Sequence, residues 1–314
     1  MGRKITWGLV STIKAPARDI LDFAAHHLEL GAHRLHIYLD EDCPEARRAL
    51  RKDPRCRVTV TNDDYWSRRR QRPEKHQARQ TANATRAYRR DPGVEWLGHI
   101  DVDEFLVARD LPLADQLAAL PEDARTARIR PVEALAEPGS GTPRWFKACH
   151  PRQSPRNAQT AQIYPTYGEL LNGGFLSHVT GKIFVRTGLE GISLRIHNAF
   201  DEAGRIPNDH ELEGMHLCHM HAPSWDAWQR SYRYRLAAGS YRPDLQGAPS
   251  IPTTMNALFN AIEADGGEAA LRLFYDEVCT ASPQLRARLE AHGLLHRIAL
   301  DPGAARARVF PGTV

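Results

Sequence analysis

The feature that most constrains the fold is a regular alternation of strand-like and helix-like segments in the first hundred residues. The strand-like segments are apolar and rich in β-branched residues, and the segments between them have helical spacing of apolar residues. The strands are expected at 5–13, 36–40, 56–60 and 94–100, and the helices at 16–30, 44–51 and 73–90. This alternation predicts an α/β fold, in which a mostly parallel central sheet has helices on both faces.

The remainder of the chain is less regular at first and then helical. Strands are expected at 181–186 and 192–197, where they are candidates for a hairpin, and helices at 225–238, 253–264 and 268–292. The end of the chain, with Pro302, Gly303 and Pro311, is expected to form a loose tail of about a dozen residues. We therefore divide the chain into an α/β domain at 1–222 and a helical region at 223–314 that packs on the same domain.

The composition places the chain among globular proteins. Its 314 residues are 42% hydrophobic and 25% charged, and no run reaches the roughly 18 apolar residues that a membrane-spanning helix needs. The first seven residues lack the apolar core of a signal peptide, so a cytoplasmic location is expected. Five scattered cysteines without a Cys-x-x-Cys pair argue against both a disulfide framework and a thiolate zinc site.

Two acidic clusters follow predicted strands. Asp40 and Asp42 end the second strand, and Asp101 and Asp103 follow the fourth. In open parallel sheets, ligands bind beyond the carboxyl ends of the strands. Both clusters are therefore expected at the ligand-binding edge, although Asp42 fits a helix-capping role equally well.

Asp101-Val102-Asp103 has the composition of a site for a hard divalent cation. In an extended strand, carboxylates two positions apart point to one face. Magnesium and manganese prefer such oxygen ligands and retain affinity for phosphates. The pattern therefore predicts a metal that neutralises a diphosphate leaving group. The alternative for an Asp-x-Asp motif considered by itself is that the two carboxylates cap the following turn.

Further candidate ligand-binding residues are basic or contain imidazole. Lys14, Lys75 and Lys182 lie near predicted strand or helix ends, where each could pair with phosphate. The segment 215–221 carries His216, Cys218, His219 and His221, and a neutral imidazole nitrogen of His219 or His221 is expected as a further metal ligand. The spacing in this segment fits no standard zinc pattern.

The net charge of +4 is unevenly distributed. Arginines and one lysine are concentrated between Arg68 and Arg90, a stretch that would attract an anionic ligand or acidic lipid headgroups, or would simply be a solvated helix face. Few aromatic residues interrupt this stretch and no nucleic-acid-reading motif accompanies it, so nucleic acid is not expected as a partner.

Taken in order, three segments resemble the GT-A-type glycosyltransferases of the large inverting family 2, and more narrowly its bacterial branch related to family 92. They are the opening strand and helix through the Tyr-Leu-Asp at 38–40, the Trp-Leu-Gly-His-Ile-Asp-Val-Asp-Glu-Phe-Leu block at 96–106, and the Gly-Lys-Ile-Phe-Val-Arg and Leu-Cys-His-Met-His elements at 181–186 and 217–221. The chain departs from the branch at Ala15-Pro16, where Asn-Glu is usual, and at Met220, where Tyr is usual.

The resemblance implies a GT-A, Rossmann-like fold and transfer of a sugar from a UDP- or GDP-linked donor to a glycan or lipid-linked acceptor. It maps Asp101 and Asp103 to a manganese or magnesium and diphosphate site, Asp40 to the nucleotide site and His219 to a third metal ligand. An inverting displacement needs a base for the acceptor hydroxyl. The candidates are Glu104, His178, Asp209 and Glu211, and among the catalytic residues we favour Asp103, Glu104 and Glu211.

Two other functions fit the same residues. The carboxylates and histidines would also serve a metal-dependent hydrolase of nucleotide sugars or phosphoesters. The basic stretch would suit a non-catalytic module that binds anionic glycan or lipid, and peripheral membrane contact is open under either function.

Overall fold

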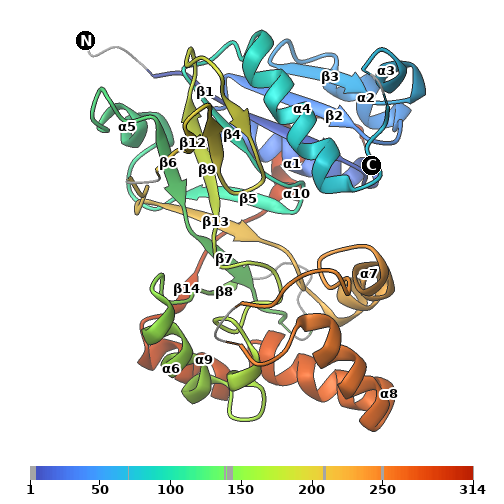
Figure 1. Ribbon diagram of the computed structural model, residues 1–314, viewed down its shortest axis with the longest axis vertical. Helices are drawn as coiled ribbons and strands as arrows, with labels where there is room; N and C mark the ends of the chain where they lie inside the picture. The colour runs from blue at the N-terminus through green and yellow to red at the C-terminus, as the bar shows by residue number, and fades with distance from the viewer. Residues whose placement is uncertain are drawn as a thin grey trace. The chain divides into compact units, whose positions relative to one another are not determined.

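The computed structural model describes residues 5–69, 71–137, 139, 144–207, 210–248 and 251–313. It divides into two compact units (Figure 1). Unit 1 comprises 1–130, 180–217 and 301–314, and unit 2 comprises 131–179 and 218–300. Each unit thus combines segments that are distant in sequence, whereas the expected boundary at 222/223 is a single cut.

Unit 1 contains a six-stranded sheet in the order β3-β2-β1-β4-β9-β6. Its first four strands are parallel, and β9 runs antiparallel to both β4 and β6. The strands are β1 (Trp7–Ile13), β2 (Arg34–Leu39), β3 (Cys56–Val60), β4 (Trp96–His99), β6 (Thr126–Ile129) and β9 (Lys182–Arg186). The predicted α/β class with a mostly parallel central sheet is therefore confirmed.

Helices cover both faces of this sheet. In Figure 1, α4 (His76–Arg90) crosses the near face, and α1 (Ala17–Glu29) lies behind the sheet with α10 (Pro302–Val309). Alternate strand residues supply the two apolar layers, because successive side chains of a strand point to opposite faces. Val10 and Leu97, for example, share a buried cluster with Ala84 and Ala87 of α4.

Shorter elements complete unit 1. They are the helices α2 (Pro44–Leu50), α3 (Asp63–Ser67) and α5 (Leu113–Ala118) and the strands β5 (Glu104–Ala108) and β13 (Met215–His219). The last two residues of β13 belong to unit 2. The strands β10 (Ser193–Leu194), β11 (Ala199–Asp201) and β12 (Gly204–Arg205) form a separate small sheet. The chain connecting β9 to β13 packs the small sheet beside α4, since Ile192, Leu194 and Ala199 join the same buried cluster as Ala84 and Ala87.

Unit 2 is mainly helical. An aromatic core formed by Trp228, Tyr232, Phe259 and Phe274 joins its helices. The helices are α6 (Gln153–Ile163), the 3₁₀ turn η1 (Gly168–Leu170), α7 (Trp225–Ala237), α8 (Met255–Cys279) and α9 (Pro283–Ala291), and the strands are β7 (Pro131–Ala134), β8 (Trp145–Lys147) and β14 (Leu295–Arg297). Non-helical dihedral angles at Gly266 and Gly267 interrupt α8, close to the predicted break between helices at 264–268.

Two sequence predictions are wrong. The segments at 181–186 and 192–197 do not form a hairpin, because β9 pairs with β4 and β6 while β10 pairs with β11. The end of the chain is not a loose tail but the helix α10. The Asp301 carboxylate caps this helix by accepting from the Ala304 N–H at 2.9 Å, and Pro302 occupies its first turn.

Within the described part of the chain, no helix is both long and apolar enough to span a membrane. All five cysteines are free thiols, as expected from their spacing.

Candidate active site

The strand order of unit 1 changes direction at β1. Strands β2 and β3 lie on one side of β1, and β4 lies on the other. In open α/β sheets, the crevice beyond the carboxyl ends of the strands at such a switch point is the usual ligand-binding position. Lys14 directly follows β1, and Asp101 follows β4 after a single residue, so both predicted site residues lie at the carboxyl ends of the two strands that meet at the switch point.

The two aspartates lie in a tight turn and not in an extended strand. Residues 101–104 connect β4 to β5, and the Glu104 N–H donates to the Asp101 carbonyl oxygen at 3.1 Å. The expectation that both carboxylates project from one face of a strand is therefore wrong. The turn instead presents the two carboxylates one residue apart at the carboxyl edge of the sheet, and both side chains are partly exposed.

Lys182 contacts this turn from β9. Because β9 runs antiparallel to β4, its first residue lies at the edge where β4 ends. The Lys182 Nζ donates to Asp101 Oδ2 at 2.6 Å and lies 3.3 Å from Glu104 Oε2. Gly181 makes this approach feasible, since its φ of +76° and its closeness to the Ile129 carbonyl exclude a side chain. The phosphate-binding role predicted for Lys182 therefore competes with a pairing to two carboxylates.

Two further hydrogen bonds hold the turn in place. The Gln80 side-chain amide of α4 donates to Asp101 Oδ1, and the Asp101 N–H donates to Glu104 Oε2 at 2.8 Å.

Burial alone would lower the pKa of Lys182, but the charges of Asp101 and Glu104 outweigh it and raise the pKa above its ordinary value. Lys182 is therefore a buried cation at neutral pH.

Asp40 lies at the predicted edge of the sheet, but its carboxylate is already paired with basic side chains of the protein. Its side chain is 1% exposed. Oδ2 accepts from Arg79 Nε at 2.9 Å and lies 3.4 Å from His76 Nδ1, while Oδ1 accepts from Arg72 at 3.2 Å. Burial would raise the pKa of Asp40, but the bonds from His76 and Arg79 outweigh it and hold the pKa well below its ordinary value. Asp40 thus anchors the basic stretch to β2.

Much of the basic stretch is therefore used inside the fold. Besides Arg72 and Arg79, Arg69 stacks 3.7 Å from the Tyr65 ring centroid, and Arg89 donates to the Ile192 carbonyl at 2.7 Å. Arg70 lies outside the described residues. Each of these four arginine side chains therefore has a partner within the protein and does not need an external anion.

The predicted lysines at this edge are accessible. Lys14 is 67% exposed at its side chain and pairs with Glu41 at 2.8 Å. Lys75 is also exposed and occupies the N-cap position of α4. A phosphate in solvent can therefore reach either side chain, and surface ion pairs such as that of Lys14 contribute little free energy against such an exchange.

The candidate bases occupy different surroundings. Glu104 is 0% exposed and is engaged with the Asp101 N–H and Lys182, so its contacts are those of a residue that holds the turn. Glu211 is partly exposed and is paired with Arg130, which donates from Nε at 2.9 Å. Asp209 lies outside the described residues.

The histidines of the predicted metal set belong to unit 2. His219 is 5% exposed, and its ring centroid lies 5.1 Å from that of His221 and 5.8 Å from that of His178. The His221 Nε2 makes a 2.7 Å hydrogen bond with the Tyr241 hydroxyl, so metal ligation by this ring would use Nδ1. Burial lowers the pKa of His221 well below its ordinary value, which leaves the ring neutral, as metal binding requires.

One acidic residue near the turn was missed from the sequence. Asp19 lies in the first turn of α1, and burial together with the charges of Asp22 and Asp103 raises its pKa. The available signal was its position after β1, at the same edge as Lys14. It was overlooked because an acidic residue in a first helical turn is common for electrostatic reasons alone.

The residues of the turn suit a hard divalent cation. Asp103 supplies a partly exposed carboxylate. Each Asp101 oxygen has two lone pairs, and its bond to Gln80 or Lys182 uses one of them. These oxygen donors fit magnesium or manganese better than a soft metal.

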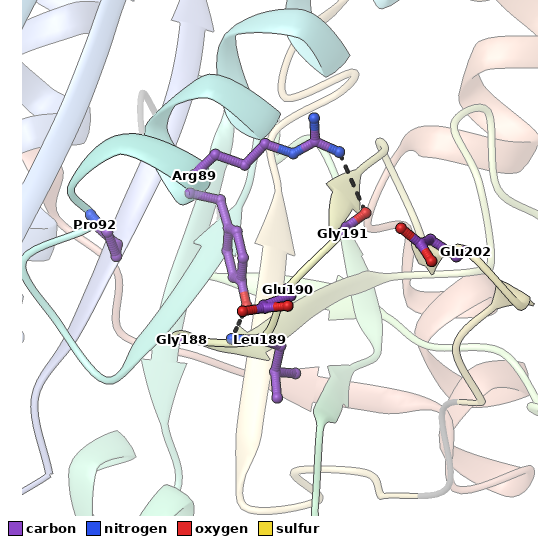
Figure 2. A pocket seen from close by; sticks show the side chains of 8 residues that line it. Arg89, Pro92, Gly188, Leu189, Glu190, Gly191 and Glu202 are labelled. Atoms are coloured by element: carbon purple, nitrogen blue, oxygen red, sulfur yellow. Dashed lines mark hydrogen bonds between the residues drawn. The ribbon is translucent and has the colours of Figure 1, made fainter.

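A separate hollow of about 710 Å³ lies at the other end of α4 (Figure 2). Tyr88, Arg89 and the loop 188–191 line it, and the polar groups there bond to one another, as in the 3.2 Å bond from the Leu189 N–H to the Tyr88 hydroxyl. His76, at the first turn of α4, contacts Asp40, so the hollow does not coincide with the carboxyl edge of the sheet.

Comparison with known proteins gave no matching family model and no matching curated protein. Among solved structures, similarity was found to HddC from Yersinia pseudotuberculosis, at 9% identity and a TM-score of 0.29 over 42% of this chain and 60% of that one. Galactosyltransferase LgtC, in complex with donor and acceptor sugar analogues, is similar at 13% sequence identity and a TM-score of 0.27, over 57% of each chain. Mouse xyloside xylosyltransferase 1 is similar at 12% identity and a TM-score of 0.29, over 59% of this chain and 67% of that one. The chain thus spans less than two thirds of the first two, and likenesses at this level leave the function to be argued from the residues.

Proposed function

We propose that the protein is a GT-A-type glycosyltransferase that transfers a sugar from a UDP- or GDP-linked donor to a glycan or lipid-linked acceptor, with inversion and with manganese or magnesium. One observation carries the proposal: the Asp101–Asp103 turn follows β4 at the switch point of a mostly parallel sheet. That position is where nucleotides bind to open α/β sheets, and carboxylates there are suited to a metal diphosphate.

The residues divide the task as follows. Asp103 and Asp101 would hold the metal, and the metal would supply charge stabilisation to the departing diphosphate. Lys14 and Lys75 are accessible cations for the phosphates. For the acceptor hydroxyl, Glu211 is the more accessible of the two described carboxylate bases, whereas Glu104 would act by fixing the turn.

The first experiment is calorimetric titration of UDP and GDP, each with and without manganese. We expect metal-dependent binding of one nucleotide by the wild-type protein and none by Asp101→Ala/Asp103→Ala, because the double variant lacks both metal-binding carboxylates. A matched control is Glu122→Ala/Asp123→Ala, which removes two exposed acids from the loop before β6. Absence of binding of both UDP and GDP, with and without manganese, would refute the proposal.

A turnover assay then separates transfer from hydrolysis. With the nucleotide that binds, its sugar-linked form is incubated with and without candidate glycan acceptors, and both free sugar and nucleotide are measured. Nucleotide release that depends on an acceptor supports the transferase. Equal release of free sugar without any acceptor would favour the metal-dependent hydrolase.

A further inference from the structure

Lys182 is unusual among the charged groups of unit 1 because it is almost completely buried yet contacts a partly exposed carboxylate. Its side chain is 2% exposed, as against 27% for Asp101, and the two are joined at 2.6 Å. On the other side it faces Glu104, which is 0% exposed, at 3.3 Å. Lys182 therefore connects a buried carboxylate to one that solvent and ligands can reach.

The charges of this group follow from the sequence. Asp101, Asp103 and Glu104 carry three negative charges within four residues, and Lys182 offsets one of them to leave a net charge of −2. Without Lys182, Glu104 would be a buried carboxylate with no ammonium beside it, which is strongly unfavourable. Lys182 thus allows three acids to share one short turn.

The bonds to Asp101 also fix its direction. Oδ1 is held by the Gln80 amide and Oδ2 by Lys182, and the backbone N–H of the same residue is held by Glu104. A side chain that is held at both oxygens cannot rotate to wrap a metal in a bidentate manner. It can still accept a hydrogen bond through the second lone pair of an oxygen.

We propose that Lys182, with Gln80, is a positioning residue that orients the Asp101 carboxylate to accept from a ribose hydroxyl or a metal-bound water, so that Asp103 is the direct metal ligand of the turn. This inference rests on the proposed function and assigns different roles to the two aspartates. Supporting groups of this kind matter because they set the geometry of the groups that touch the ligand, and their loss typically costs about 10- to 100-fold in affinity or activity.

The test uses a charge-matched exchange. Lys182→Met/Glu104→Gln removes one positive and one negative charge, so the net charge of the turn stays at −2, and the new side-chain amide oxygen at position 104 can still accept from the Asp101 N–H. We expect binding of manganese alone to be retained, since Asp103 is unchanged, while affinity for the nucleotide falls by about 10- to 100-fold. Manganese binding is followed by its electron paramagnetic resonance signal and nucleotide binding by calorimetry.

The same exchange in an Asp101→Asn background distinguishes positioning from general damage. Because Lys182 acts through Asp101, we expect no further loss of nucleotide affinity there. An equal loss in both backgrounds, or no loss in either, would overturn the proposal. Complete loss of manganese binding in Asp101→Asn alone would also overturn it, because Asp101 would then be a direct ligand.

Gln80→Leu is a second variant. It leaves no unpaired buried charge, so we expect the protein to fold. It removes the other bond to Asp101, so we expect a smaller fall in nucleotide affinity that again disappears in the Asp101→Asn background. If wild-type protein binds manganese but neither nucleotide, the proposed function fails. If wild type and all of these variants bind nucleotide equally, only the role of Lys182 and Gln80 fails.

Discussion

Among the described residues, each unit buries a lysine against a carboxylate, and the surroundings of Lys147 and Lys182 differ. In unit 2, Lys147 is 0% exposed and lies 3.2 Å from Glu133, which is 1% exposed. Its Nζ also donates to the carbonyl oxygens of Gly174 and Val278 at 2.5 and 2.8 Å. In unit 1, Lys182 instead holds the partly exposed Asp101.

The partners of the carboxylates differ in the same way. Glu133 accepts from the N–H groups of Leu176 and Ser177 and from the Ser177 hydroxyl, so the unit 2 pair ties a loop to β7 and β8. Burial alone would lower the pKa of Lys147, but the interactions with Tyr164 and Glu133 outweigh it and raise the pKa. Burial alone would raise the pKa of Glu133, but the charge of Lys147, with His219 and the hydrogen bonds from Ser177 and Leu176, outweighs it and lowers the pKa. A buried lysine–carboxylate pair is therefore no sign of a site by itself. What distinguishes the pair in unit 1 is a carboxylate that a ligand can reach.

The largest expected effect is on the stability of unit 2. Lys147→Met leaves Glu133 as a buried charge without its cation, so we expect the free energy of unfolding to fall by about 3–5 kcal/mol. Urea unfolding followed by tryptophan fluorescence measures it. Lys147→Met/Glu133→Gln removes both charges and should recover much of the loss. If the single and double variants were equally unstable, the pair would matter for packing and not for charge.

A smaller effect is expected at alkaline pH. The pKa values of Lys147 and Lys182 are raised above the ordinary 10.5, so the stability they contribute is fully present below that pH and is lost as the pH rises through their folded-state values. The free energy of unfolding, measured at several pH values on both sides of 10.5, should therefore fall less steeply with rising pH in Lys147→Met/Glu133→Gln than in wild type. Identical slopes would mean that the pKa of Lys147 is the same in the folded and the unfolded protein.

The smallest effect is expected at the exposed pair of Lys14 and Glu41. Both side chains are 67% exposed, so Lys14→Met should change the free energy of unfolding by at most about 1 kcal/mol. The same variant should weaken nucleotide binding if Lys14 contacts phosphate at the switch point. Calorimetry on this stable variant tests that role directly, and unchanged nucleotide affinity would remove Lys14 from the site.

The sequence was most informative where structure is local. Periodicity located β1 to β4 and the helices α1, α2 and α4 to within a few residues, because alternating and helical burial patterns are properties of short segments. It missed the short helix α3. It also placed Asp40 and Asp101 at the carboxyl edge, since this follows from a parallel sheet. The helix α10 was locally predictable too, and the Asp301-Pro302 start was overlooked in favour of the glycines and prolines around it.

The partners of the site residues were not predictable in this way. Asp40 is neutralised by Arg72 and Arg79, more than thirty positions away, and Lys182 meets Asp101 across 81 positions. Such pairs depend on which strands are neighbours, and the antiparallel placement of β9 beside β4 leaves no local signature. For the same reason, the sequence suggested phosphate for Lys182 and nucleotide for Asp40 without showing that each already had a protein partner.

The discontinuity of unit 1 has a consequence for how the chain is made. Its final segment packs against α1 through Arg306 to Asp22 at 3.1 Å and Arg308 to Glu29 at 2.7 Å. Synthesis proceeds from the N-terminus, and domains generally fold as units while they emerge from the ribosome. Unit 2 has all its residues once position 300 has been translated, whereas unit 1 still lacks α10. The unit that carries the Asp101–Asp103 turn, although begun first, is therefore the one that is completed last.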